Sequence, residues 1–553
     1  MGTILFRKIF TWALPFLYGT DIGGLGRGDW GTTACMLLAG GCVIGLSLTL
    51  LKNLGSGETR FHGPADVIHS ILERDGRMPV GQAISSAIVS SIAISFAAPV
   101  GRYGPAVHLG ASLGSLVGQW LKIGRSGVQT LLAAGVAAAI GASFDAPIAG
   151  VLFAHEVMIG HFALRAFAPV TVAAIVGTAV ARAWHYDYFL LSGHSAEVPF
   201  ELPQLPWFAL IGLAGGFLSI GLMWTTIHCG RLATSLKIPI PLQPVLAMAI
   251  TAGIAAFAPE ILGLGEELVG TSMAMTPVTD HLGAGALALL GLAAAKLVAS
   301  AACLGLRIPG GIFAPALFIG TMLGSAAAQV IDAPYAICTL VGMGAVISSV
   351  VGAPLATILI VFELTGNYEA ATAAMVGVVV ANAVVTRVFA RSFFHRQLRE
   401  WKVNLDRSPE ARLLSRRTVS EIMLDKPVST LPEASFEEVQ KLAAANDGLE
   451  VFLTDKDGRL THLIQPCDLL ARWDTPPEEL QNLKAHDLAK PLRGYLAADM
   501  SLRVALKGVQ NFRGVALPIV GDTDSMQLVG QVTEADFIRA YNDAVSEAHA
   551  ERS

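Results

Sequence analysis

The sequence is poor in charged residues. Only 15% of its 553 residues are Asp, Glu, Lys or Arg, whereas a soluble domain averages about 25%. The deficit is local, because the first 400 residues hold 39 charged residues and the last 153 hold 42. We therefore predict a multi-pass membrane domain followed by a soluble domain. The net charge of −5 is small and dispersed, so nucleic acid is not an expected partner.

The sequence also lacks the patterns of disulfide and metal sites. Its six cysteines are scattered without a CxxC spacing, which argues against both a disulfide framework and a zinc knuckle. An intramembrane metalloprotease needs HExxH on one helix face. Here His155 and Glu156 are followed by His161, which lies about 240° around a helix from His155. No metal site and no enzymatic activity are predicted.

Residues 1–30 are amphipathic rather than uniformly apolar. Arg7 and Lys8 lie among aromatic residues such as Phe10 and Trp12, and no small-residue cleavage site follows an apolar core. We interpret this segment as a retained amphipathic helix at the membrane surface rather than as a signal peptide.

Apolar stretches separated by glycine, proline or short polar breaks run through residues 31–400. Several are shorter than the about 20 residues that a simple membrane span needs. Short, interrupted segments are typical of helices that end inside the membrane, where irregular backbone lines a cavity. We therefore predict an all-α polytopic membrane fold with broken re-entrant helices, surrounded by lipid, and a transport function.

An internal repeat divides this domain into halves at about 31–190 and 205–400. Six residues recur 210 positions later, namely Gly101, Pro105, Gly110, Leu113, Gly114 and Ser115 as Gly311, Pro315, Gly320, Leu323, Gly324 and Ser325. Six more recur 207 positions later, namely Gly135, Ala146, Pro147, Ala149, Leu152 and Glu156 as Gly342, Ala353, Pro354, Ala356, Leu359 and Glu363. Matches in the same order throughout indicate a duplication.

The repeated motifs GRYGP (101–105) and GIFAP (311–315) each open an apolar helix, with proline in its first turn. A helix N-terminus carries unpaired N–H groups and about half a positive charge. Two such ends that converge in mid-membrane would bind an anion without a fixed cation, and we predict this for the residues ahead of the two prolines. The glycines further along are predicted instead to permit close helix packing: Gly110, Gly114, Gly320 and Gly324.

These motifs resemble those of the CLC family of chloride channels and proton/chloride antiporters. The resemblance covers roughly residues 30–400 and rests on four stretches: GRYGPAVHLG, FDAPIAGVLFAHE, PGGIFAP and GAPLATILIVFELTGNY. It implies a homodimer with one pore in each subunit, two inverted halves, and a path for chloride or a similar small anion between the ends of broken helices. The residues that would line or gate the path are Arg102, Tyr103, Gly104, Gly311, Ile312, Phe313 and Ala314.

Two positions depart from the pattern of the family's antiporters. Those proteins carry a glutamate where this chain has Tyr103, and a second, inner glutamate where it has Val157. A phenol, with an ordinary pKa near ~10, cannot cycle protons at neutral pH as a carboxylate does. We therefore predict a passive anion channel without proton coupling. The alternatives are a sensor with a vestigial pore and an antiporter whose proton carrier is His62 or Glu156, although the repeat indicates that Glu156 and Glu363 pin helices.

The family's pore tyrosine and pore serine are also altered. The stretch SFFH (392–395) puts Phe394 at the place of the tyrosine, so the hydroxyl that would touch the anion is lost. For the serine, the letters GSG around Ser56 match but lack the following proline, while His62 stands just before a Gly-Pro pair at an expected helix start. We favour His62 over Ser56 as the pore residue.

Two basic residues, Lys296 and Arg307, flank the apolar segment that leads to Gly310. Each would either raise the positive potential at an anion entrance or extend its charged end into water while its stem packs in the membrane. The sequence leaves both roles open.

A basic cluster follows the last apolar stretch and consists of Arg387, Arg391, Arg396, Arg399 and Lys402. Such clusters mark the cytoplasmic side, so we expect the C-terminal part in the cytoplasm and the chain in the inner membrane of a bacterium. The C-terminal part contains two similar stretches, 415–474 and 484–546, which resemble a tandem pair of α/β cystathionine-β-synthase (CBS) domains.

CBS pairs that bind adenine nucleotides hold the ribose or phosphate with a Thr/Ser-x-x-Asp motif. Thr533 and Asp536 fit this motif, whereas the first repeat has Gln465 ahead of Asp468 and lacks the hydroxyl. The alternative is that Thr533 only caps its helix. No cofactor is therefore required, and an adenine nucleotide is the one that the resemblance would suit.

Overall fold

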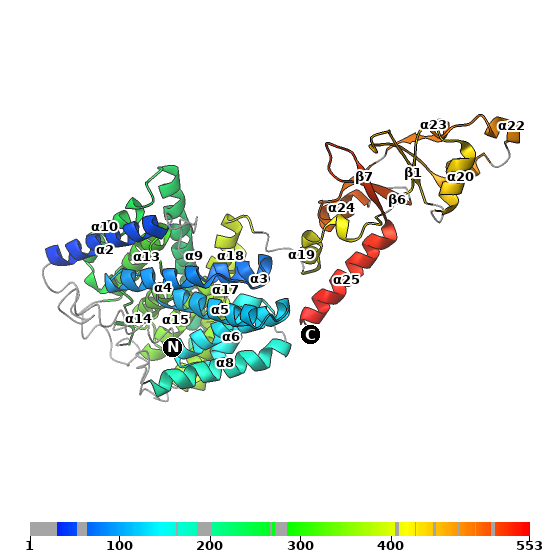
Figure 1. The fold of residues 1–553 in the computed structure, drawn as a ribbon. Coiled ribbons are helices and arrows are strands. Elements are labelled where there is room, and N and C mark those ends of the chain that lie inside the picture. Colours follow the sequence, from blue (N-terminus) through cyan, green and yellow to red (C-terminus); the bar gives the residue numbers. More distant parts are fainter. Residues whose placement is uncertain are drawn as a thin grey trace. The chain divides into compact units, whose positions relative to one another are not determined.

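The computed structural model divides the chain into two units between Leu405 and Asp406 (Figure 1). The residues that it describes are 30–51, 63–161, 164–184, 201–265, 268–270, 285–403, 409–425, 427–445, 449–472, 475–492, 494–509 and 515–552. Each unit has its own buried hydrophobic residues.

The described part of the first unit consists of helices and their connections. The first half contains α2 (Trp30–Leu51), α3 (Pro64–Glu73), α4 (Val80–Ser95), α5 (Tyr103–Trp120), α6 (Arg125–Phe144), α7 (Pro147–Phe153), the π-helix η3 (Ala154–Ile159) and α8 (Leu164–Ala183). The second half contains η4 (Leu202–Gln204), α9 (Leu205–Ser235), α10 (Leu242–Ala255), η5 (Pro259–Ile261), α13 (Ala286–Gly305), α14 (Phe313–Ala327), α15 (Tyr335–Val351), α16 (Pro354–Thr365), α17 (Tyr368–Val388) and α18 (Phe393–Glu400). Within the described residues, 6 helical stretches are long and apolar enough to cross a membrane, whereas others such as α4, α14 and α16 are shorter. The predicted mixture of spanning and broken helices is confirmed.

The two halves pack their repeated glycines in the same way. In the first half α5 lies against α6, and a Cβ built on Gly110 would lie 2.4 Å from the carbonyl oxygen of Gly135. In the second half α14 lies against α15, and a Cβ built on Gly320 would lie 2.4 Å from the carbonyl oxygen of Gly342. A side chain at either position would overlap the neighbouring backbone, so the prediction that these glycines permit close packing is confirmed.

The halves differ at the helix that carries Glu156 in the first half and Glu363 in the second. In the first half α7 continues into η3 and ends at Gly160, whereas in the second half α16 stays α-helical and ends at Gly366. The stretch from the first-turn proline to the closing glycine is one residue longer in the first half. The wider hydrogen-bonded turn of a π-helix accommodates such an extra residue. Val157 lies in this π-helix and is buried.

The second unit contains a 4-stranded and a 3-stranded β-sheet, whose first three strands are arranged alike. Its elements are α19 (Pro409–Arg416), η6 (Val419–Glu421), β1 (Ser429–Thr430), α20 (Phe436–Ala445), β2 (Val451–Thr454), β3 (Leu460–Ile464), α21 (Pro466–Leu470), α22 (Pro477–Leu480), α23 (Ala485–Leu488), β4 (Lys490–Pro491), β5 (Leu496–Ala497), α24 (Leu502–Val509), β6 (Ala516–Val520), β7 (Leu528–Thr533) and α25 (Glu534–Arg552). In the first sheet β1 and β2 are parallel and β2 and β3 antiparallel, and in the second β5 and β6 are parallel and β6 and β7 antiparallel. Strand β4 completes the first sheet by pairing with β3. The repeated pattern confirms the predicted α/β pair.

The two sheets are joined at their hairpins. The backbone N–H of Leu460 donates to the carbonyl oxygen of Met526 at 2.9 Å, and the N–H of Leu528 donates to that of Gly458 at 3.2 Å. Apolar residues from both hairpins, including Phe452 and Leu528, pack together behind these bonds. The tandem pair is therefore one packed module.

Candidate functional site

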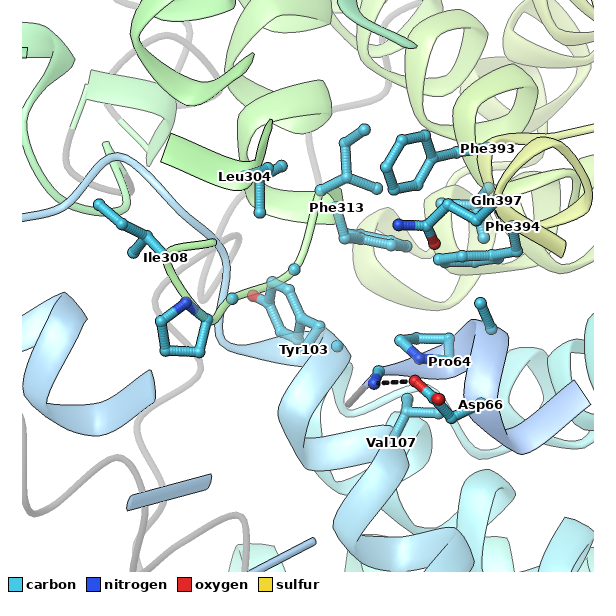
Figure 2. A pocket seen from close by; sticks show the side chains of 18 of the residues that line it. Pro64, Asp66, Tyr103, Val107, Leu304, Ile308, Phe313, Phe393, Phe394 and Gln397 are labelled. Carbon is cyan, nitrogen blue, oxygen red and sulfur yellow. Dashed lines mark hydrogen bonds between the residues drawn. The ribbon is translucent and has the colours of Figure 1, made fainter. Parts of the chain in front are cut away.

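A cavity of about 280 Å³ lies where the two halves of the first unit, the membrane unit, meet (Figure 2). Its walls include the starts of α3, α5 and α14, the end of α13 with the segment that follows it, and α18. Because both halves and the last helix contribute to it, the cavity is a product of the duplicated fold rather than of one local motif.

A pair of backbone hydrogen bonds joins the two repeated motifs beside the cavity. The N–H of Gly101 donates to the carbonyl oxygen of Gly311 at 2.7 Å, and the N–H of Gly311 donates to that of Gly101 at 2.6 Å. A Cβ built on Gly104 would lie 2.9 Å from the Cα of Gly311. Glycine at these positions therefore lets the N-terminal ends of α5 and α14 approach each other.

Three helices begin at the cavity, and they differ in how their first N–H groups are satisfied. The N-cap residues of α5 and α14, Arg102 and Ile312, make no side-chain capping hydrogen bond within the described structure. The carboxylate of Asp66 in α3, by contrast, accepts a hydrogen bond from the N–H of Gly63 at 2.9 Å. Two of the three helix starts therefore keep their partial positive charge, and the third carries a carboxylate.

Tyr103 is the first residue of α5, and its side chain is 2% exposed. Its ring stacks on Phe144 with the centroids 4.3 Å apart and meets Phe313 edge-on at 5.2 Å. The Tyr103 hydroxyl accepts a hydrogen bond from the guanidinium of Arg102 at 3.4 Å. In Figure 2 the ring lies between Ile308 and Phe313. The aromatic contacts therefore join the two halves at the wall of the cavity.

Helix α18 contributes aromatic and amide side chains to the cavity. Phe394 supplies a ring without a hydroxyl, and Gln397 supplies an amide one turn later (Figure 2). Ser392 is the N-cap residue of α18, and its side chain accepts a hydrogen bond from the backbone N–H of His395. Near the other end of the helix, Glu400 pairs with Arg231 at 2.6 Å. The sequence interpretation missed Gln397, for which the only signal was its helical spacing from Phe394.

Six of the residues predicted to line the path do line this cavity: Tyr103, Gly104, Gly311, Ile312, Phe313 and Phe394. Arg102 and Ala314 are buried without lining it, and Val157 does not line it either. Ser56 and His62 lie outside the described residues, although Gly63, the neighbour of His62, lines the cavity. The pore and gate roles of these residues remain predictions.

Among the described residues that line the cavity, only Asp66 and Arg307 are charged. The Nε of Arg307 donates to the Oε1 of Gln243 at 2.9 Å. Gln243 lines the cavity too, and its side chain is buried. The guanidinium is therefore held at the wall by a buried amide.

Lys296 takes neither of the two roles predicted for it. Its side chain is fully buried and does not line the cavity. Its Nζ donates to the carbonyl oxygens of Ile261 and Gly263, each at 2.7 Å. These carbonyl groups replace the water that the ammonium group would otherwise need, which is why Lys296 need not reach the membrane surface.

The predicted nucleotide motif of the second CBS repeat forms a helix cap. The Thr533 hydroxyl donates to Asp536 at 2.7 Å, and the N–H of Asp536 donates back to the hydroxyl oxygen at 3.3 Å. In the first repeat Asp468 pairs with Lys490. In each repeat the aspartate is thus bonded to another side chain of the protein. An adenine nucleotide at Thr533 remains a prediction. No group of three or more His, Cys, Asp or Glu that could hold a metal occurs in the described ranges.

Comparisons of the sequence with known protein families match both units. The family described as "Voltage gated chloride channel" matches residues 40–386, and the CBS domain matches residues 490–543. The "Voltage-gated ClC-type chloride channel ClcB" of Escherichia coli O9:H4 (strain HS) is 26% identical over 347 residues, which is 62% of this chain and 81% of that protein. The protein of the same name from Salmonella dublin is 26% identical over 365 residues, or 65% of this chain and 85% of that protein.

Solved structures share the fold at lower sequence identity. A slow cyanobacterial Cl−/H+ antiporter has a TM-score of 0.60 at 21% identity and covers 73% of this chain and 96% of its own. A CLC-type fluoride/proton antiporter has a TM-score of 0.59 at 20% identity, covering 71% and 94%. A eukaryotic CLC transporter has a TM-score of 0.53 at 19% identity and covers 97% of both chains. The last similarity extends over the second unit as well.

Proposed function

Because the chain belongs to the voltage-gated chloride channel (CLC) family, we propose that it is a passive chloride channel without proton coupling. The observation that carries this proposal is Tyr103 at the start of α5, inside the cavity that both halves form. The family's antiporters have a glutamate at this position, which takes up and releases a proton. A phenol keeps its proton at neutral pH, so anion flux would follow the anion gradient and the voltage alone.

The cavity offers an anion several sources of stabilisation. The starts of α5 and α14 bring two partial positive charges toward it, each worth about 0.3–1 kcal/mol at an exposed site and up to about 2 kcal/mol when partly buried. Backbone N–H groups at such helix starts bind anions directly. Arg307 is the one cationic side chain among the described lining residues. A small anion is therefore the ligand that this wall favours.

Tyr103 is positioned to obstruct the path as well as to touch the anion. Its ring is held between Phe144 and Phe313 and is almost completely buried. An anion that passes this point must displace the ring, and the hydroxyl is a hydrogen-bond donor of the kind that a halide accepts. We therefore assign Tyr103 both a gating role and an anion-binding role.

Two further features support conduction without protons. Val157 stands where the antiporters have their inner glutamate, and it has no titratable group. Glu156 directly precedes Val157, and its carboxylate accepts hydrogen bonds from the backbone N–H groups at the start of α16. A carboxylate that caps a helix is less suited to repeated protonation, because each protonation would disrupt the cap.

The setting of the channel follows from the same resemblance. We expect a homodimer in the inner membrane of a bacterium, with one anion path in each subunit and the CBS pair in the cytoplasm. The basic cluster after the last apolar helix supports this orientation. Large apolar side chains on the outside of the membrane unit, such as Leu46, Phe217 and Val379, support contact with lipid or with a second subunit.

The proposal is tested with the purified full chain in liposomes that contain a high chloride concentration. With the voltage set by potassium and valinomycin, chloride should leave until its gradient balances the voltage, and imposing a pH gradient should leave the reversal potential unchanged. Uphill proton movement driven by a chloride gradient would establish the antiporter instead. A complete lack of flux, compared with protein-free liposomes, would favour the sensor with a vestigial pore.

A further inference from the structure

The turns that end α4 and α13 occupy equivalent places in the two halves. Each helix is followed by a residue in the left-handed region, Ala97 with φ of 56° and Arg307 with φ of 68°, and these two residues are 210 positions apart. The same backbone hydrogen bond closes each turn, from Ala98 to Ala93 at 3.1 Å and from Ile308 to the carbonyl oxygen of Cys303 at 2.9 Å. Glycine is the usual residue at such a position, since it has no Cβ to strain.

The two equivalent positions carry very different side chains. Ala97 is fully buried and packs in the apolar core, whereas Arg307 lines the cavity. The duplicated turn therefore places a charge beside the cavity in only one of the two halves. Lysine occupies the same left-handed position after α5, α9 and α18, at Lys122, Lys237 and Lys402. The place of Arg307 on the cavity wall, rather than its backbone strain, therefore sets it apart.

The guanidinium is anchored rather than loosely extended. Its Nε donates to the Oε1 of Gln243 at 2.9 Å, and the Nε2 of Gln243 donates to the carbonyl oxygen of Ile238 at 2.9 Å. Gln243 is 4% exposed. A guanidinium stays charged throughout the physiological pH range, so the anchor fixes a permanent positive charge at the wall.

The other charged side chain among the described lining residues belongs to α3. Asp66 caps the start of its own helix, where it accepts a hydrogen bond from Gly63, and the positive end of that helix offsets its charge. The remaining described lining residues are neutral. Arg307 is therefore the one source of positive side-chain charge among the described lining residues.

We propose that Arg307 is a fixed cationic subsite of the anion path, which draws chloride into the cavity and sets its apparent affinity. This inference rests on the proposed function. Electrostatic attraction in a cavity with low-dielectric walls is much stronger than in water. The positive charge therefore complements the two helix starts, which by themselves offer only partial charges.

A purely structural role is the competing explanation. Arg307 follows the last turn of α13, where a cation interacts favourably with the helix dipole, and its bond to Gln243 ties α13 to α10. A structural strut would be sensitive to the hydrogen bond and to stability, whereas a cationic subsite is sensitive to charge and to ionic strength. The two roles therefore predict different results for the same set of variants.

The test uses the full chain and two measurements: chloride flux from liposomes as a function of chloride concentration, and chloride binding to the detergent-solubilised protein by calorimetry. Arg307→Gln should raise the chloride concentration for half-maximal flux, and the dissociation constant, by about fivefold or more at low ionic strength. Arg307→Lys, which keeps the charge, should stay within about twofold of the wild type. Adding the salt of an impermeant anion should reduce the difference in chloride affinity between Arg307→Gln and the wild type.

Glycine variants provide a matched control for the backbone. Arg307→Gly removes the charge together with the left-handed strain. The relief of strain offsets part of the loss of the hydrogen bond to Gln243, and the variant should still lose chloride affinity. Ala97→Gly relieves the equivalent strain in the other half without changing any charge, and should leave the affinity unchanged. A similar loss of affinity in both glycine variants would assign the effect to the backbone and overturn the proposal.

Other outcomes separate this inference from the proposed function. If the wild type conducts and Arg307→Gln keeps its affinity and salt dependence, or if Lys and Gln are equally impaired, the cationic subsite is wrong although the channel stands. If the wild type conducts no chloride but binds it in an Arg307-dependent way, the subsite stands and the channel proposal fails. If the wild type neither conducts nor binds chloride, both are overturned.

Discussion

Glu156 and Glu363 each hold the start of a helix that belongs to the other half of the membrane unit. The carboxylate of Glu156 accepts hydrogen bonds from the N–H groups of the second and third residues of α16, at 3.1 and 2.9 Å. The carboxylate of Glu363 accepts the equivalent pair from α7, at 3.0 and 2.8 Å. Each carboxylate satisfies two otherwise unpaired donors at the positive end of a helix. The two halves are thus fastened by a crossed pair of caps.

These caps predict equal sensitivity to substitution in the two halves. Glu156→Gln and Glu363→Gln each replace one accepting oxygen by an amide nitrogen that faces a backbone donor, so each should lower the free energy of unfolding by about 1–3 kcal/mol. Denaturant unfolding of the detergent-solubilised protein measures this. Glu156→Gln should still conduct chloride without protons. A variant of unchanged stability that abolishes a proton flux would show instead that Glu156 carries protons.

The sequence predicts the equivalence of Glu156 and Glu363 but not their partners. A constant offset of 207 residues is visible in the letters and indicates a shared role. It does not indicate that each carboxylate reaches across to the opposite half, because helical spacing describes the face of one helix and not the neighbour that it meets. The extra residue before Gly160 is also visible in the sequence, but the π-helix that absorbs it follows from the backbone geometry.

At the candidate site, too, the sequence predicts which residues belong to a motif but not which distant residues they meet. The motifs around Tyr103 and Phe313 predict the glycine-rich approach of two helix starts, and the structure brings these residues together. The sequence places Lys296 in water or at an anion entrance, because it does not reveal the carbonyl partners in and after η5, more than 30 residues away in the chain. Gln397 and Gln243 were missed since single amides carry no sequence pattern. Contacts between distant segments decide these positions.

Variants of Tyr103 test its gating role and its anion-binding role together. Tyr103→Phe keeps the ring but removes the hydroxyl, and losing a hydrogen bond to an anion costs about 1.5–3 kcal/mol, so chloride affinity should fall by about tenfold or more. Tyr103→Ala removes the obstruction and should raise the maximal flux. Chloride flux from liposomes at several chloride concentrations separates the two effects.

A matched control for this pair is Tyr335→Phe. Tyr335 also begins a helix, α15, but does not line the cavity, so its loss of a hydroxyl should leave chloride affinity unchanged. Thermal unfolding of each variant identifies any general damage from the loss of ring contacts with Phe144 and Phe313. Unchanged flux and selectivity in Tyr103→Ala would remove Tyr103 from the path.

The pore position near α3 predicts a response to pH. We expect His62 to face the anion, because it precedes Gly63, which lines the cavity. An imidazole ordinarily titrates near ~6.5, so acidification between about pH 7 and pH 5 should charge it and raise the apparent chloride affinity. His62→Ser should flatten this response in liposome flux measurements, and Ser56→Ala should do little. An unchanged pH profile in His62→Ser with altered selectivity in Ser56→Ala would assign the pore role to Ser56.

The helix cap at Thr533 distinguishes a structural hydroxyl from a nucleotide ligand. Because the hydroxyl and Asp536 bond each other, Thr533→Ala should lower the stability of the second unit by about 1 kcal/mol, whereas Thr533→Ser should preserve it. Differential scanning calorimetry of the full chain, with and without ATP, measures both effects. If the motif serves only as a cap, the loss is the same in the presence of ATP. A stabilisation of the wild type by ATP that disappears in Thr533→Ala would assign an adenine nucleotide to the second repeat, since a ligand that binds only the folded protein raises its stability.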